Sequence, residues 1–499
     1  MTAAATPRLV YELYARPWLA DLARRQGRRI SLGEVPRGEL DRLAATGADL
    51  LWLMGVWPSG PRGIEIARTL PELRAEYRRL LPDFAEADVG GSPYSIAAYT
   101  VDPLLGGAGA LAWLRARLAN RGIRLLLDFA VNHTGIDHPW VVESPDLYVQ
   151  GDEEDLARAP REFFAVETKL GPRILAHGRD PYFPPWTDTA QLNLFHPETR
   201  RRLRDTLLEL ADLCDGVRCD MAMLALDEVF YRTWWERARA PLAEPAQGEA
   251  WRELIGAVRA KRPDFLFVAE AYWGREPALQ ELGFDVTYDM TLYERLRHGS
   301  GRAVRDHLRA GLDRQGRALR FLENHDEPRA AAVFPWERHR AAAVVAATVP
   351  GLLLLHDGQL EGRRERQPLQ LLRRPSEPAA PEVAAFYERL LGAVPRRPQA
   401  GWRLLEPRPA WKGNPTSEDF VASLWEENGG LRLAAVNFAP APGQCYLELG
   451  GLGLEDGEVE LRDVLSEARY RRDGGELAAR GLYLDLPPYG AHLFDVVRG

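Results

Sequence analysis

The stretch Ile123–Phe129, with the sequence IRLLLDF, decides the fold class of this chain. It is a short apolar run that contains one carboxylate near its end, and an amphipathic segment, Gly107–Arg121, precedes it. Short apolar runs between such segments are typical of the buried strands of a parallel sheet. Seven similar runs occur along the chain: Leu9–Tyr14, Asp49–Gly55, Cys214–Asp220, Phe265–Glu270, Phe284–Asp289, Leu319–Asn324 and Gly351–His356.

Segments with helical periodicity separate these runs, and Pro197–Asp212, Ala250–Arg262 and Glu382–Leu391 are the clearest. Strands that alternate with helices form βαβ units, and eight such strands favour a closed (β/α)8 TIM barrel. An open, doubly wound sheet is the alternative, but no G-x-G-x-x-G loop follows an early strand. We therefore expect an α/β protein built on a barrel.

Two breaks in the pattern predict the domain organisation. The long gap between the third and fourth runs is rich in Gly, Pro and aromatic residues, which predicts an inserted subdomain at 133–192. From residue 401 onward, short strands alternate with Gly and Pro turns, as in an antiparallel β-sandwich. The barrel is thus expected at 1–132 and 193–400, and a C-terminal all-β domain at 401–499. The strands expected there include Phe420–Trp425, Leu431–Phe438, Gln444–Leu449 and Tyr483–Leu486.

Composition restricts the partners. The 499 residues carry a formal net charge of −8, which gives no basic footprint for nucleic acid. No stretch of about 18 apolar residues and no signal-peptide pattern occurs, so we expect no membrane partner and a cytoplasmic location. The three cysteines, Cys214, Cys219 and Cys445, have neither disulfide nor metal-ligand spacing. Nothing in the sequence indicates an oligomeric state.

Polar residues stand at the carboxyl ends of four of the apolar runs, which is where the active sites of such barrels form. Any one of them could simply cap the helix that follows its strand, but four together predict a site. Arg218 and Asp220 share one face of a strand, where the cation can keep the carboxylate ionised. The full set is Asp128 with Asn132 and His133, Arg218 with Asp220, Glu270, and Asn324 with His325 and Asp326.

Asp220 and Glu270 have the chemistry that cleavage of a glycosidic bond with retention requires. That reaction needs two carboxyl groups roughly 5–5.5 Å apart. Adjacent strands lie about 4.8 Å apart, so residues at the ends of neighbouring strands meet this need. The aromatic residues near Glu270 and the second carboxylate predict a raised pKa for Glu270.

Four segments of the chain together resemble, in order and spacing, the signature segments of the α-amylase family of glycoside hydrolases. They are DFAVNH (Asp128–His133), GVRCD (Gly216–Asp220), FVAE (Phe267–Glu270) and FLENHD (Phe321–Asp326). The resemblance covers nearly the whole chain. It implies a retaining enzyme in which Asp220 is the nucleophile, Glu270 the general acid/base, and Asp326 a third carboxylate that stabilises an oxocarbenium-like transition state.

The resemblance also implies a sugar pocket. Tyr94, in the SPYS stretch after the second strand, matches the aromatic platform of the family, although a core tyrosine is the alternative. His133, Arg218 and His325 are implied to surround the sugar. Asp128 is interpreted as a carboxylate that holds the region of Arg218 and His133 by hydrogen bonds.

The sequence departs from the family after the nucleophile. Many amylases carry a Lys-His pair there, which serves further sugar subsites and the calcium site, whereas this chain has Met221–Leu224, MAML. Asn132 matches a position that often ligates calcium in the family, so the resemblance allows a calcium ion there. No cofactor is expected to be required. Alternatively, His133, Asp137 and His138 would ligate zinc.

Three functions stay open on the sequence. The first is cleavage of α-glucosidic bonds in oligosaccharide or polysaccharide α-glucans through a covalent glycosyl-enzyme intermediate. The second transfers the glycosyl group of that intermediate to a sugar, as in transglycosylases, in relatives acting on trehalose or sucrose, or in maltosyl transfer. A catalytically silent scaffold is the third, and the intact carboxylates argue against it. The run Glu361–Arg366 is either a solvated loop or a phosphate-binding group. His356 either lines the site or is a buried, hydrogen-bonded histidine.

Overall fold

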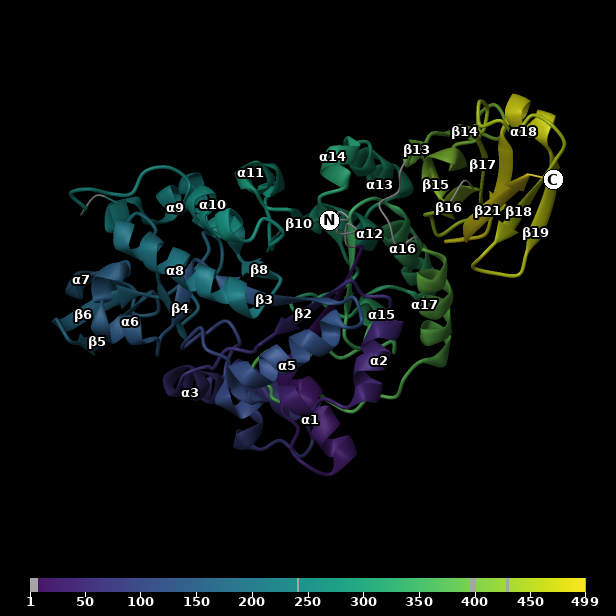
Figure 1. Cartoon of the computed structure of the whole chain (residues 1–499). Helices are drawn as coiled ribbons and strands as arrows, with labels where there is room; N and C mark the ends of the chain where they lie inside the picture. Colours follow the sequence, from purple (N-terminus) through teal and green to yellow (C-terminus); the bar gives the residue numbers. More distant parts are fainter. Residues whose placement is uncertain (1–7, 240–241, 395–400, 428–429, 499) are drawn as a thin grey trace. The chain divides into compact units, whose positions relative to one another are not determined.

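Eight parallel strands close into a barrel in the order β1-β12-β11-β10-β9-β8-β3-β2, in a computed structural model that describes residues 8–239, 242–394, 401–427 and 430–498 (Figure 1). The closed barrel confirms the predicted fold and excludes the open sheet. The strands are β1 (Leu9–Tyr14), β2 (Leu50–Met54), β3 (Arg124–Ala130), β8 (Gly216–Asp220), β9 (Leu266–Ala269), β10 (Val286–Tyr288), β11 (Ala318–Arg320) and β12 (Leu352–His356).

Strand β11 is shorter than the sequence predicts. The apolar run continues to Asn324, but the strand ends at Arg320. Further along, the Asn324 side chain accepts hydrogen bonds from the amides of Asp326 and Glu327 and so forms a turn. Residues 321–324 stay buried without being strand.

Strand register brings the polar residues of β3, β8 and β9 to the same end of the barrel. Asp128 pairs with Arg218 and Ala130 with Asp220, while Cys219 pairs with Ala269, the residue before Glu270. This close pairing requires a glycine at the start of β8. A side chain at Gly216 would place its Cβ 2.6 Å from the backbone oxygen of Leu266, so only glycine fits there.

The predicted helices are present with nearly the expected bounds. Several begin with proline at the first helical position, where its missing N–H costs nothing. The longer helices are α1 (Ala15–Gln26), α2 (Arg37–Ala45), α3 (Pro61–Thr69), α4 (Pro71–Leu80), α5 (Gly107–Ala119), α8 (Pro197–Leu213), α9 (Asp227–Trp234), α10 (Ala250–Lys261), α12 (Met290–His298), α13 (Gly301–Leu308), α16 (Trp336–Thr348) and α17 (Pro381–Ala393). The shorter ones are α6 (Pro139–Glu143), α7 (Glu153–Arg158), α11 (Glu276–Leu282), α14 (Leu312–Gln315), α15 (Ala330–Val333) and α18 (Gly474–Arg480). No helix in the described ranges is long and apolar enough to cross a membrane.

Two small antiparallel sheets lie between β3 and β8 in the chain. Strand β4 (His133–Gly135) pairs with β7 (Thr189–Gln191), and β5 (Phe163–Thr168) forms a hairpin with β6 (Gly171–Ala176). The expected division into 1–132 with 193–400, 133–192 and 401–499 stays a prediction. The chain separates into two compact units: Tyr11–Tyr288 with Gln367–Ser376, and Met1–Val10 with Asp289–Arg366 and Glu377–Gly499.

The C-terminal strands form two antiparallel sheets with a shared apolar core, as predicted. Phe420, Leu433 and Phe494 from the larger sheet and Leu447 and Leu484 from the smaller one belong to the same buried cluster. The larger sheet has the order β13-β15-β16-β21-β18-β19 and the smaller one β14-β17-β20. Their bounds are β13 (Arg403–Leu405), β14 (Pro407–Pro409), β15 (Phe420–Glu427), β16 (Gly430–Asn437), β17 (Gly443–Leu447), β18 (Glu458–Asp463), β19 (Arg469–Asp473), β20 (Leu482–Leu486) and β21 (Ala491–Arg498). The three cysteines are buried free thiols.

Candidate active site

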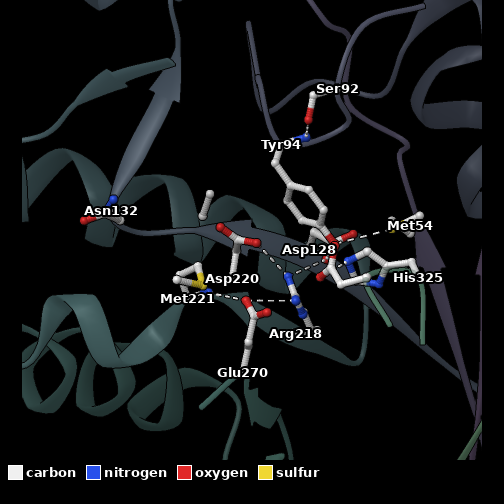
Figure 2. Close-up of polar contacts among 12 residues, drawn as sticks. Met54, Ser92, Tyr94, Asp128, Asn132, Arg218, Asp220, Met221, Glu270 and His325 are labelled. Carbon is white, nitrogen blue, oxygen red and sulfur yellow. Dashed lines mark hydrogen bonds and ion pairs between the residues drawn. The ribbon is translucent and has the colours of Figure 1, made fainter. Parts of the chain in front are cut away.

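Arg218 is the centre of a buried charge cluster at the end of β8. Its Nη1 donates to Oδ1 of Asp220 at 2.8 Å, and its Nη2 lies 2.9 Å from Oε2 of Glu270. Figure 2 shows the guanidinium between the two carboxylates. Asp128 is a third, more distant partner, with its Oδ1 3.7 Å from Nη1. One cation thus holds the proposed nucleophile and the proposed acid/base on either side of it.

Aromatic rings enclose the guanidinium. Its central carbon lies 5.0, 5.2 and 5.6 Å from the ring centroids of Trp52, Tyr94 and Tyr288, and its Nε donates to the hydroxyl of Tyr288. Burial alone would lower the pKa of Arg218, but the negative charge of Glu270 and its other neighbours raise that pKa well above the usual value. The cation is therefore permanent at any working pH.

The carboxylate of Glu270 has two further donors. Its Oε2 accepts from the amide of Met221 at 2.6 Å, and its Oε1 accepts from the hydroxyl of Tyr272 at 2.9 Å. Met221 reaches it from a left-handed backbone conformation, with φ 43° and ψ 44°, which is costly for a side chain of this size. These two donors and Arg218 fix the position of the Glu270 carboxylate. The raised pKa expected for Glu270 stays a prediction.

Asp128 is buried and accepts hydrogen bonds from the residues around it. Its Oδ1 accepts from the indole nitrogen of Trp52 at 3.2 Å and from the hydroxyl of Tyr94 at 3.4 Å. Tyr94 is only half-buried, so it is not simply a core tyrosine. The backbone amide of Tyr94 donates a hydrogen bond to the hydroxyl oxygen of Ser92 at 3.2 Å. The Tyr94 ring lies beside the cluster, and the positioning role of Asp128 stays a prediction.

His133 and Asn132 follow β3 and are both buried. Burial lowers the pKa of His133 to about 4, partly opposed by a hydrogen bond to the backbone of Tyr94, so its ring is neutral. The ring lies 5.2 Å from that of Trp186. Asn132 exchanges amide hydrogen bonds with Gln191, at 3.2 and 3.0 Å. The Asn132 side-chain oxygen is thus already engaged by protein, and a calcium ion there stays a prediction.

The zinc alternative lacks a ligand set. Asp137 accepts from the amide of Gly63, and His138 accepts from the amide of Trp140 and so caps helix α6. Within 8–239, 242–394, 401–427 and 430–498, no group of three or more His, Cys, Asp or Glu side chains could hold a metal ion.

In the other compact unit, Asn324, His325 and Asp326 form the turn after β11. His325 is buried, and its Nε2 lies 2.9 Å from Oδ2 of Asp326, whose side chain is partly exposed. Arg366 donates to the backbone oxygen of Asp326 at 2.9 Å. Arg366 therefore supports the turn, and a phosphate-binding role for the run Glu361–Arg366 stays a prediction.

Sequence reasoning missed a buried network that supports this turn. Arg329 donates to Oε1 of Glu323 at 2.6 Å and contacts Nδ1 of His356 at 2.8 Å, while the amide of Ala330 donates to Glu323. Burial alone would raise the pKa of Glu323, but Arg329 and His356 lower it. His356 is thus a buried, hydrogen-bonded histidine, as one of its two interpretations held. Tyr288 was also missed, although it ends β10 and the rule about strand ends would have found it.

Known proteins share this architecture. The family model of the α-amylase catalytic domain matches residues 40–371 of this chain. The α-amylase MalA of Haloarcula japonica is 27% identical over 375 residues, which are 72% of this chain and 45% of that protein. An α-1,4-glucan:maltose-1-phosphate maltosyltransferase of Burkholderia pseudomallei is 27% identical over 362 residues, 70% of this chain and 27% of that protein. This chain therefore spans less than half the length of either relative.

Solved structures agree on the fold. The noncanonic maltogenic α-amylase AmyB of Thermotoga neapolitana superimposes with a TM-score of 0.64 at 18% identity, covering 98% of this chain and 99% of the other. An α-amylase of Geobacillus thermoleovorans, solved with acarbose, gives 0.64 at 18% identity and covers 98% of both chains. Since the catalytic-domain model matches well over half of the sequence, this chain belongs to the α-amylase family of glycoside hydrolases.

Proposed function

We propose that this protein cleaves α-glucosidic bonds in α-glucans or maltooligosaccharides, with retention, through a covalent glycosyl-enzyme intermediate. The bridge from Arg218 to Asp220 and Glu270 is the observation that carries the proposal. A buried cation keeps Asp220 ionised and aligned as a nucleophile, and the same cation fixes the second carboxylate close by.

Each step of the reaction has a group to perform it. Asp220 attacks the anomeric carbon while Glu270 donates a proton to the leaving oxygen, which breaks the glycosidic bond and leaves the sugar as an ester of Asp220. Glu270, now ionised, takes a proton from water, and the resulting attack releases the sugar and regenerates Asp220. Asp326 is proposed as the third carboxylate on the strength of its motif, and Tyr94, His133, Arg218 and His325 as the groups around the sugar.

Transfer to a sugar acceptor is a second candidate. The maltosyltransferases among the relatives favour it, and so does the absence of the Lys-His pair after Asp220. Both candidates share the first half of the reaction and differ in whether water or a sugar attacks the intermediate.

Product analysis tests the proposal and separates the two candidates. The protein is incubated with starch, maltooligosaccharides, maltose, trehalose, sucrose and maltose 1-phosphate, and the anomer first released is determined by NMR. Retained configuration is expected, and longer products identify transfer. Glu270→Gln should lower turnover of unactivated substrates by about 10²-fold or more, because it removes general acid catalysis. An inverted product, or unchanged turnover in Glu270→Gln, would show that the mechanism is wrong.

A further inference from the structure

Two buried carboxamides, those of Asn132 and Gln191, bind each other just beyond the end of β3. The Nδ2 of Asn132 donates to Oε1 of Gln191 at 3.2 Å, and the Nε2 of Gln191 donates to Oδ1 of Asn132 at 3.0 Å. Asn132 is 1% exposed and Gln191 is 0% exposed. Each side-chain oxygen of this carboxamide pair therefore faces an amide group of the other residue.

The Gln191 side chain also joins two segments of backbone. Its Nε2 lies 2.8 Å from the backbone oxygen of Asn132 and 3.1 Å from that of Leu192. The backbones pair as well, because the amide of Leu192 donates to the carbonyl of Asn132 at 3.1 Å and His133 pairs with Gln191 between β4 and β7. The carboxamide pair thus fastens the end of β3, and with it His133, to the segment that precedes helix α8.

A calcium site needs a different set of groups at this place. Calcium takes about six to eight oxygen ligands, and carboxylates supply the negative charge that offsets its own. The side-chain and backbone oxygens of Asn132 both accept hydrogen bonds from the Gln191 amide, and Gln191 carries no charge. A cation beside Asn132 would meet the positive ends of these N–H groups. It could be ligated only after the pair had broken, and its charge would be buried among neutral groups.

The surrounding sequence lacks the other parts of such a site. After Asp220, Met221–Leu224 carry no oxygen or nitrogen in their side chains, where many amylases have the Lys-His pair that serves the calcium site. Over the residues that the structure describes, no cluster of three or more His, Cys, Asp or Glu side chains could hold a metal ion. Asn132 is therefore a position of the family's calcium site without the partners that calcium requires.

We propose that the carboxamide pair of Asn132 and Gln191 takes the place of a bound calcium ion, so that this protein folds and stays stable without calcium. A metal ion joins segments of chain by ligating oxygens from each of them, and here hydrogen bonds between neutral groups do the same. Because both side chains are buried, removing one leaves polar atoms of the other without a partner. The role is the same whether water or a sugar attacks the intermediate.

Calcium removal tests the proposal on the wild type. The full chain is purified from a medium that contains calcium, its metal content is measured by mass spectrometry, and thermal unfolding is followed in excess EGTA and in excess calcium. A bound ligand stabilises the folded state in a concentration-dependent way. We expect no stoichiometric calcium, and unfolding temperatures in EGTA and in calcium that agree within about 1 °C.

Gln191→Met tests the pair itself. Methionine has a similar length but no amide, so the buried carboxamide of Asn132 loses its partner. The unfolding temperature should fall by about 2 °C or more, and added calcium should not restore it. Gln150→Met is the matched control in the same segment, because the Gln150 amide donates only to Asp146 at the surface, at 3.1 Å. Its unfolding temperature should change by less than about 1 °C.

A double variant separates the pairing from a general sensitivity of this region. Leucine has nearly the shape of asparagine, so Asn132→Leu combined with Gln191→Met leaves neither carboxamide in place. The double variant should lose less stability than the sum of the two single variants, because no buried amide is left without its partner.

Three results would overturn the proposal: stoichiometric calcium whose removal by EGTA lowers the unfolding temperature of the wild type, recovery of Gln191→Met on addition of calcium, or an unfolding temperature of Gln191→Met equal to that of Gln150→Met. If Gln191→Met does not fold, the calcium content and unfolding of the wild type decide the matter alone. None of these measurements uses turnover, so the proposed function stands or falls separately.

Discussion

Replacing Arg218 with methionine tests whether one buried cation holds the site together. Methionine is apolar and has a similar length, so Arg218→Met removes the charge and both contacts, at 2.8 Å to Asp220 and 2.9 Å to Glu270, with little change in packing. Because Arg218 is 1% exposed, water does not replace it. Removing one partner of a buried ion pair costs about 3–5 kcal/mol in the free energy of unfolding.

The destabilisation should depend on pH. At pH 7 the variant holds two carboxylates without their cation, and protonation of one of them relieves the repulsion. The difference from the wild type should therefore be largest at pH 7 and smaller at pH 5. Urea unfolding at both values measures it. Turnover should also fall, because a protonated Asp220 is no nucleophile.

A surface arginine provides the control. Arg201 binds Glu198 on helix α8 but is half exposed, so Arg201→Met should cost no more than about 1 kcal/mol. A loss below about 1 kcal/mol in Arg218→Met at pH 7, equal to that of the control, would refute the reasoning.

Two further predictions concern protonation and backbone strain. Burial lowers the pKa of His133, His138 and His339 to about 4. Between pH 6.5 and pH 4 the unfolded chain therefore binds protons that the folded chain does not. The free energy of unfolding should decrease as the pH is lowered through this range, by up to about 3 kcal/mol per histidine. Urea unfolding from pH 7 to pH 5 with NMR titration of the histidines checks this, and titration of all three near pH 6.5 would contradict it. Met221→Gly should keep the amide that donates to Glu270. Because glycine adopts the positive φ at this position without strain, the free energy of unfolding should stay unchanged or rise by about 1 kcal/mol. Met221→Pro removes that donor and cannot adopt the conformation, so it should cost about 3 kcal/mol or more; equal stability of the two variants would show that the turn does not matter.

Patterns that depend on neighbours along the chain were predictable from the sequence. Arg218 and Asp220 are two residues apart, and on a strand this spacing alone puts them on one face. The barrel followed from the repetition of apolar runs. By contrast, nothing in the apolar run Leu319–Asn324 marks the early end of β11 at Arg320.

Features that depend on tertiary contacts were not predictable. Glu323 stands within a signature segment, but its pairing with Arg329 and His356 exists only in the folded chain. Trp52 belongs to an apolar run in which nothing marks the ring that will face a cation. The left-handed conformations of Met221 and Trp273 are unexpected for both residue types, so sequence patterns favour other backbones there.

Trapping the covalent intermediate tests the central claim that Asp220 is the nucleophile. In Glu270→Gln, α-glucosyl fluoride can still form the ester, because fluoride leaves without a proton donor, but its hydrolysis is slow without the base. Mass spectrometry of the digested protein should then find one added glucosyl unit on the peptide that contains Asp220, and none when Asp220→Asn is also present. A glucosyl unit on another residue, or steady release of fluoride with no modified peptide, would contradict the account.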